Sequence, residues 1–273
     1  MGILEDVEQM EKAGTGSFAG FVLLAEDRWD KEQFKQDLKN IWGIEACKQD
    51  EGGTDVKNSD SFAFSVDNMD AVVSLMPAPV PDHEAEKTAA NNYMWPCAMD
   101  NVRAHKAHLL VAVLGQDAPL LERGKLFVKV MSACCRQQGV LGVYTRGAVF
   151  QPEFYQGFSE MMLDGKLPVF NWIWFGMHQN ERGVSAYTYG MDVFGKDEME
   201  VLDSCVQPGV LRDFLSSIAA YVLEEDVVLE DGETIGFSKE QHLSITRSEG
   251  VFLPGMTLKI GYMDLSGEQS YPD

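Results

Sequence analysis

Three histidines in the first half of the chain are the side chains best suited to bind a metal ion. His105 and His108 are three residues apart, a spacing that places two imidazoles on one helical face, and His83, Glu84 and Glu86 precede them. The order lacks the H-E-x-x-H pattern, in which one helix supplies two ligands and a base. Histidines at a helix end that bind carbonyl groups are the alternative. The sequence favours this alternative, so we expect no cofactor and no metal, and His83, His105 and His108 are the ligands if a metal binds.

The cysteines give little support for a nucleophile. They stand at positions 47, 97, 134, 135 and 205, an odd number with no C-x-x-C pair. Cys134 and Cys135 end an expected helix, where the partial negative charge raises the pKa of a thiol. Motifs of α/β-hydrolases, P-loop proteins and standard dinucleotide binders do not occur. We expect reduced structural thiols, and the sequence leans away from an enzyme.

Two carboxylates and several aromatic residues form the second candidate site. Glu198 and Glu200 would share one face of a strand and could act as an acid and base pair, or they could belong to an acidic surface. Aromatic residues on an expected strand could line a ligand pocket between two lobes or pack on two faces. The residues of this candidate pocket are Trp172, Trp174, Tyr187, Thr188, Glu198 and Glu200.

The elements that must position these side chains follow a recognisable order in the first half of the chain. A strand at residues 18–25 and a helix at 30–42 are followed by a hairpin of strands 61–66 and 71–76. Prolines at 77, 79 and 81 end the hairpin. A helix from Asp82, kinked near Pro96, and a strand at 108–114 complete a β-α-β-β-α-β order. This order is typical of a ferredoxin-like α/β sandwich.

The second half of the chain could repeat the first. Its expected elements are a connecting helix at 119–138, strand 140–145, helix 151–163, hairpin strands 169–177 and 185–193, helix 209–223, and strands 243–248 and 256–262. We therefore predict an α+β protein with two ferredoxin-like lobes, a pseudo-duplication packed as one body. The predicted boundaries are an N-terminal segment 1–17, a first lobe 18–117, the connecting helix 118–139, a second lobe 140–263 and a flexible tail 264–273.

Composition restricts the partners. The 273 residues carry a formal net charge of −21, which repels nucleic acid and anionic membranes and favours a basic protein partner. The start of the chain lacks the basic and long apolar stretches of a secretory signal, and no apolar run approaches the roughly 20 residues of a membrane span. We expect a cytoplasmic protein that binds neither nucleic acid nor membrane. The sequence does not indicate an oligomeric state.

Three segments carry a resemblance to a known family. Residues 76–81 (MPAPVP), 107–113 (AHLLVAV) and 187–201 (YTYGMDVFGKDEMEV) resemble the bacterial domain-of-unknown-function family 4261, in an order that extends from about residue 18 to residue 262. The resemblance implies no activity, cofactor or catalytic residue. It implies that Gly190 and Gly195, which suit turns or close packing, belong to the family pattern. The other pattern residues are Pro77, Pro79, Thr188, Phe194, Glu198 and Glu200.

Two hypotheses of function follow from these patterns. The first is a non-enzymatic acidic binding protein that meets a basic protein partner, for example an immunity or antitoxin-like protein that masks a toxin. The alternative is a small-molecule enzyme or sensor with a pocket between the two lobes. A third reading, in which the acidic face mimics nucleic acid, needs carboxylates spaced like phosphates, and composition cannot show that spacing.

Overall fold

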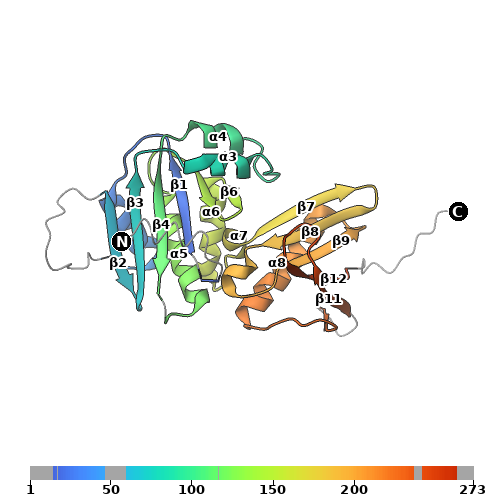
Figure 1. Ribbon diagram of the computed structural model, residues 1–273. Coiled ribbons are helices and arrows are strands. Elements are labelled where there is room, and N and C mark those ends of the chain that lie inside the picture. Colours follow the sequence, from blue (N-terminus) through green and yellow to red (C-terminus); the bar gives the residue numbers. More distant parts are fainter. Residues whose placement is uncertain (1–14, 17, 47–59, 116, 237–241, 263–273) are drawn as a thin grey trace. The chain divides into compact units, whose positions relative to one another are not determined.

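The computed structural model describes residues 15–16, 18–46, 60–115, 117–236 and 242–262 of the chain (Figure 1). The chain divides into two compact units, Met1–Trp172 and Ile173–Asp273. Each unit contains a six-stranded sheet, and the described residues form seven α-helices, so the predicted α+β class is confirmed. Residues 47–59, which include Cys47, the tail 264–273 and most of segment 1–17 lie outside the described residues.

The first unit has one six-stranded sheet, and helices occur between most of its strands along the chain. The sheet order is β2-β3-β4-β1-β5-β6, and every pair of neighbouring strands is antiparallel. Its strands are β1 (Phe18–Leu24), β2 (Ser61–Val66), β3 (Met69–Met76), β4 (Ala107–Leu114), β5 (Val140–Thr145) and β6 (Ala148–Phe150). Its helices are α2 (Lys31–Trp42), η1 (Pro81–His83), α3 (Glu84–Ala89), α4 (Ala98–Ala104), α5 (Leu120–Cys134), α6 (Pro152–Ser159), η2 (Glu160–Asp164) and α7 (Val169–Trp172).

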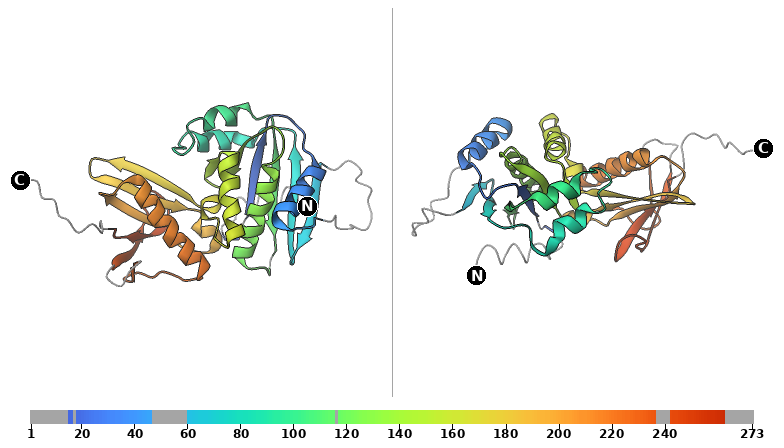
Figure 2. Two further views of the ribbon diagram at one scale, coloured as in Figure 1. Left: turned by 180° about the vertical axis from the view of Figure 1, so that it is seen from behind. Right: turned by 90° about the horizontal axis from the view of Figure 1, so that it is seen from above.

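Helices cover both faces of this sheet because its central strands are apolar on both faces. Strand β4 is buried along seven of its eight residues. In the right-hand view of Figure 2, helices α2 (blue), α5 (green) and α6 (yellow-green) lie on one face and α3 and α4 (teal) on the other. Phe34 of α2 packs against Phe62 and Phe64 of β2 on the first face. On the second face, Ala85 and Val102 join a buried cluster with residues of β1 and β4.

Local signals in the sequence account for several element boundaries. The Asp30 side chain accepts hydrogen bonds from the amides of Glu32 and Gln33 and so caps α2. Asp67 and Asn68 adopt positive φ angles in the turn between β2 and β3, which suits a tight hairpin. Asp82 does not cap a helix as predicted, because it has φ of 52° inside η1, and α3 starts after His83.

The first unit has the predicted β-α-β-β-α-β order of elements, but its strand order differs from that of a ferredoxin-like sheet. A ferredoxin-like sheet places its first and third strands side by side, whereas here β4 lies between β1 and β3. The register explains the difference, since the apolar β4 pairs along its length with β1 on one edge and β3 on the other. The prediction identified the elements and misplaced one strand.

The second unit has a mixed sheet. Its order is β10-β11-β12-β9-β8-β7, in which only the β12 and β9 pair is parallel among the described strands. Its strands are β7 (Trp174–Asn180), β8 (Gly183–Tyr189), β9 (Met199–Ser204), β10 (Thr234–Ile235), β11 (Leu243–Glu249) and β12 (Met256–Ile260). Its helices are η3 (Met191–Phe194) and α8 (Pro208–Glu224), and α8 contacts β7 and β8.

The pseudo-duplication is not confirmed, because the second unit runs through three strands, one α-helix and three strands, with the short η3 between β8 and β9. The boundary between the units also lies later than the predicted connecting helix. Strand β5, which was expected in the second lobe, extends the first sheet by pairing with β1, and β6, which was not predicted, pairs with β5. The first unit continues through α7 to Trp172.

The predicted strand at residues 169–177 is wrong in its first part. Residues 169–172 form the short helix α7, and the strand begins at Trp174. Trp172 is held in the helix by its indole Nε1, which donates to the Gly124 carbonyl at 3.1 Å. Trp172 and Trp174 therefore do not alternate on one strand.

Among the described residues, no helix combines the length and apolar character needed to cross a membrane.

Candidate functional site

The three candidate metal ligands lie on different elements of the first unit, with His83 in η1. His105 follows α4 and His108 lies within β4, so they do not share a helical face. Buried His105 accepts a hydrogen bond at Nε2 from the Val80 amide at 2.9 Å. His108 Nδ1 donates to the Ala78 carbonyl at 2.8 Å, and burial lowers the pKa of His108 to about 4.

These contacts give the histidines a structural role. His105 and His108 fasten the proline-rich stretch that contains Pro77 and Pro79 to α4 and β4. Exposed His83 instead pairs with Glu86, with Nδ1 and Oε1 at 3.2 Å. Within the described parts of the chain, no three His, Cys, Asp or Glu side chains are grouped as metal ligands. His108 binds a carbonyl group as the alternative interpretation expected, but it lies within a strand and not at a helix end.

The vicinal cysteines are buried at the end of α5. Burial raises the pKa of both Cys134 and Cys135 above that of an ordinary thiol, so both are protonated near neutral pH. Cys97 and Cys205 are exposed, so two of the four described thiols are buried, whereas the sequence favoured mostly buried thiols. The prediction of a raised pKa is right, and burial is its largest cause.

Glu198 lies just before β9 and binds the turn that follows β8. Its Oε1 accepts from the amides of Gly190 and Met191 at 2.6 and 2.9 Å, and its Oε2 accepts from the Thr188 hydroxyl at 2.7 Å. The same hydroxyl accepts from the Met199 amide at 2.8 Å. Gly190 fits this turn because its φ is 127°, a value that favours glycine. Glu198 thus closes the turn that leads into η3.

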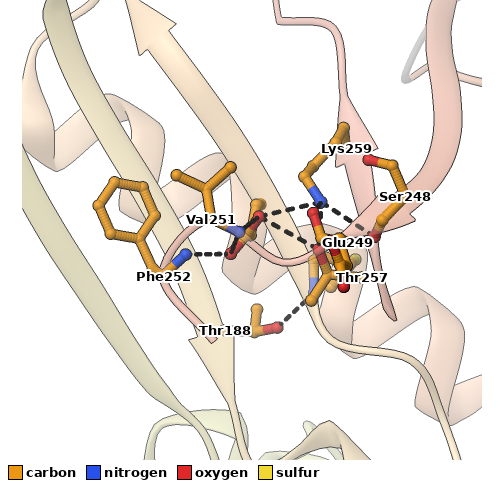
Figure 3. Close-up of polar contacts among 9 residues, drawn as sticks. Thr188, Ser248, Glu249, Val251, Phe252, Thr257 and Lys259 are labelled. Carbon is orange, nitrogen blue, oxygen red and sulfur yellow. Dashed lines mark hydrogen bonds and ion pairs between the residues drawn. The ribbon is translucent and has the colours of Figure 1, made fainter. Parts of the chain in front are cut away.

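Glu200 is fully buried in β9 and binds the loop between β11 and β12. Its carboxylate accepts from the amides of Val251 and Phe252, at 3.0 and 2.9 Å for the shortest contacts. Its Oε2 also accepts from the Thr257 hydroxyl at 3.1 Å and lies 3.2 Å from Lys259 Nζ. Figure 3 shows these donors, with Val251 and Phe252 on one side and Thr257 and Lys259 on the other.

The two carboxylates have opposite pKa shifts. Burial raises the pKa of Glu198, and hydrogen bonds from Thr188 and Gly190 offset this effect only in part. Burial acts in the same direction on Glu200, but the amides of Val251 and Phe252 and the charge of Lys259 lower its pKa overall. Each carboxylate has its oxygens bound within the fold and has its own set of partners. Their hydrogen bonds are those of structural anchors.

Tyr187, one of the aromatic candidates, packs against other residues of the second unit. The Tyr187 ring lies over Gly176, where a Cβ would clash with it, and it stacks on Phe252 with ring centroids 5.4 Å apart. Phe252 is the residue whose amide binds Glu200. Of the six candidate pocket residues, Trp172 belongs to the first unit and the other five to the second. Strand pairing brings Tyr187 beside Glu200.

A surface segment that sequence analysis passed over is the most acidic part of the second unit. We call residues 224–233 the acidic segment. It contains Glu224, Glu225, Asp226, Glu230, Asp231 and Glu233, and all six are exposed. The signal was available in the sequence, since residues 173–273 hold 18 acidic and six basic side chains, against 25 and 16 in residues 1–172. Charge density, calculated for each unit separately, would have located it.

The cations described in the second unit are all engaged with carboxylates. The pairs are Arg182 with Asp203, Lys196 with Asp226, Arg212 with Asp213, Arg247 with Asp197, and Lys259 with Glu200. Among the described residues, the side chains of Glu224, Glu225 and Glu230 have no cationic partner. The acidic segment therefore keeps negative charge that the described cations of the unit do not neutralise.

A small cavity of about 190 Å³ lies next to the acidic segment. We call it the edge pocket. Its lining residues are Met191, Gly195, Lys196, Asp197, Met199, Val222, Val227, Val228, Leu229 and Leu258. Gly195, one of the residues of the family pattern, ends η3 with φ of 72°, and neighbouring Phe194 is buried. The edge pocket is thus formed by elements of the second unit alone.

Comparison with known proteins gives one match. Residues 187–261 match the model of the family described as "Domain of unknown function (DUF4261)". No curated protein and no solved structure is significantly similar to the chain. The matched region is shorter than the resemblance implied, and it contains Glu198, Glu200, the acidic segment and the edge pocket. The second unit therefore carries a domain of the DUF4261 family, over residues 187–261.

Proposed function

We propose that this chain is a non-enzymatic, acidic binding protein of the cytoplasm that docks a basic protein partner through the acidic segment of its second unit. The observation that carries the proposal is the imbalance of charge in that unit. Its described cations are paired with carboxylates, while Glu224, Glu225 and Glu230 have no cationic partner among the described residues. A partner that supplies lysine or arginine side chains would complete these pairs.

Electrostatics favours a protein as the partner. The negative potential of the second unit repels nucleic acid and anionic lipid and attracts a basic surface. Complementary charge accelerates encounter and makes association sensitive to salt, since the Debye length is about 10 Å at 0.1 M ionic strength. One role of this kind is masking, in which the acidic protein covers the basic working surface of a toxin, as an immunity protein does.

The internal use of reactive groups supports binding in preference to catalysis. The carboxylates of Glu198 and Glu200 accept hydrogen bonds from backbone amides, and the buried histidines bind backbone groups. The buried thiols have raised pKa values and are poor nucleophiles. In the part of the chain that the structure describes, no specific contact favours the alternative of a small-molecule enzyme or sensor.

Affinity capture from the source cells tests the proposal. The bait proteins are the unmodified chain, the triple variant Glu224→Gln, Glu225→Gln, Glu230→Gln, and a control, Asp27→Asn, Asp117→Asn, Asp164→Asn. The control removes the same charge at exposed positions of the first unit. We expect a basic protein, identified by mass spectrometry, on the unmodified and control baits at about 50 mM salt, with loss at about 300 mM salt or on the first variant. Equal capture by all three baits, or no basic protein on any, would refute the proposal.

A further inference from the structure

The edge pocket has an apolar interior and a charged rim. Met191, Met199, Val222 and Leu258 line its inner wall and are each buried. Val228, at its opening, is 69% exposed, and its neighbours Val227 and Leu229, which also line the pocket, are partly exposed. Contiguous apolar residues at the surface beside a cavity are typical of a site that another molecule covers.

The size of the pocket restricts its occupant. Pockets for drug-sized ligands measure about 300–1,000 Å³. The edge pocket, at about 190 Å³, is smaller than this range and suits one large side chain. Protein interfaces commonly concentrate binding energy in such an anchor, which a charged rim shields from water.

The charges around the opening restrict the occupant further. The lining residue Lys196 pairs with Asp226 at 2.6 Å, and the lining residue Asp197 pairs with Arg247 at 2.7 Å. The acidic segment continues from α8 past Val227, Val228 and Leu229, which line the pocket, to Glu230. An apolar anchor that enters here is therefore flanked by carboxylates and is best carried on a basic segment.

We propose that the edge pocket binds one large apolar side chain of a partner protein, presented between lysine or arginine residues that pair with the acidic segment. This inference rests on the proposed function and adds to it the position and chemistry of the contact. Charge provides attraction over the whole segment, while the apolar side chain fixes the register of the partner.

Methionine methyl NMR measures this binding directly, because Met191 and Met199 line the pocket. The full chain, labelled with carbon-13 at the methionine methyl groups, is titrated with two blocked peptides, Lys-Lys-Phe-Lys-Lys and Lys-Lys-Ser-Lys-Lys. Met191→Leu and Met199→Leu assign the two signals. We expect the phenylalanine peptide to shift both methyl signals in a saturable manner, through the ring current, and the serine peptide to bind at least several-fold more weakly.

Two variants separate the pocket from the acidic segment. Val228→Ser alters an exposed side chain, so the fold is retained. We expect this variant to weaken binding of the phenylalanine peptide several-fold and to leave binding of the serine peptide unchanged. The triple glutamine variant of the acidic segment should weaken binding of both peptides. Equal binding of the two peptides, lost only in the triple variant, overturns the pocket and leaves the proposed function intact. No shift of Met191 and Met199 with either peptide also overturns the pocket, while the capture experiment decides the proposed function separately.

Discussion

Glu198 and Glu200 are two residues apart in the sequence and are bound by different parts of the second unit. The cost of burying the Glu198 carboxylate is offset by neutral hydrogen-bond donors near the end of β8, namely the Thr188 hydroxyl and two backbone amides. The cost of burying the Glu200 carboxylate is offset by the amides of a loop some fifty positions later in the chain, by the Thr257 hydroxyl and by Lys259. The first site closes a local turn, and the second joins distant segments.

This difference shows which interactions set the direction of the pKa shift of a buried carboxylate. Burial penalises the charged form at both positions. Neutral donors alone leave the pKa of Glu198 above its ordinary value, whereas two amides combined with an ammonium group lower that of Glu200. Nearby charge adds to this difference, since Asp192 raises the pKa of Glu198 further and Lys259 lowers that of Glu200 further. Lys259 also makes Glu200 the more demanding residue to replace, because it is itself mostly buried.

The largest effect should come from Glu200→Gln. Either orientation of the amide places an N–H group against donors that now bind the carboxylate, and Lys259 loses its counter-charge. We expect a loss of about 3–5 kcal/mol in the free energy of unfolding of the second unit, measured by urea denaturation. Hydrogen exchange of the 250–255 loop should accelerate at the same time.

Glu249→Gln is the matched control for Glu200→Gln. Glu249 is exposed, and its interaction with Lys259 uses the backbone carbonyl, which the substitution keeps. We expect a change within about 0.5 kcal/mol. Equal losses in the two variants would show that the buried network has no special role.

Glu198→Gln should cost less, about 1 kcal/mol in the same assay. The glutamine carbonyl can replace Oε1 at the amides of Gly190 and Met191, and its amide group can donate to the Thr188 hydroxyl. No cation is left without a partner. A loss as large as that of Glu200→Gln would break the comparison between the two sites.

The pH dependence of stability should differ in sign between the two sites. The pKa of Glu200 is lowered from 4.5 in the folded state, so its contribution is complete above pH 4.5 and is lost as pH falls through the folded value. The pKa of Glu198 is raised from 4.5, so its contribution is present below pH 4.5 and is lost as pH rises through the folded value.

Denaturation of the unmodified chain and both glutamine variants, from about pH 3.5 to about pH 7, measures these contributions. The stability advantage of the unmodified chain over Glu200→Gln should shrink towards acid pH. Its advantage over Glu198→Gln should shrink as the pH rises. Parallel curves for the two variants would contradict the assigned pKa directions.

The smallest effect should follow Asp226→Asn. Asp226 pairs with Lys196 at 2.6 Å, but its side chain is 91% exposed, so water replaces the interaction at little cost. Asparagine also tolerates the positive φ of 51° at this position. We expect no measurable change in the denaturation midpoint. A clear loss would show that ion pairs at the rim stabilise the unit as buried ones do.

Local patterns predicted the helices and strands better than their arrangement. The cap at Asp30, the turn at Asp67 and Asn68, and the apolar run of β4 each act within a few residues, and their elements formed where predicted. The position of β4 between β1 and β3 depends on pairing between distant strands. The helix α7 overrode a strand-like aromatic pattern because Trp172 and Asn171 bind the first unit through Gly124 and the Tyr155 carbonyl.

The sequence by itself determined the acidic charge, the α+β class and the order of elements in the first unit, because these follow from composition and from interactions between near neighbours. Only the tertiary structure decided which donors surround Glu198 and Glu200. Helix α8 separates β9 from β11 and β12 in the chain, and the parallel pairing of β9 with β12 then brings Glu200 beside Lys259. Such a contact depends on register across a sheet, which short-range patterns do not encode.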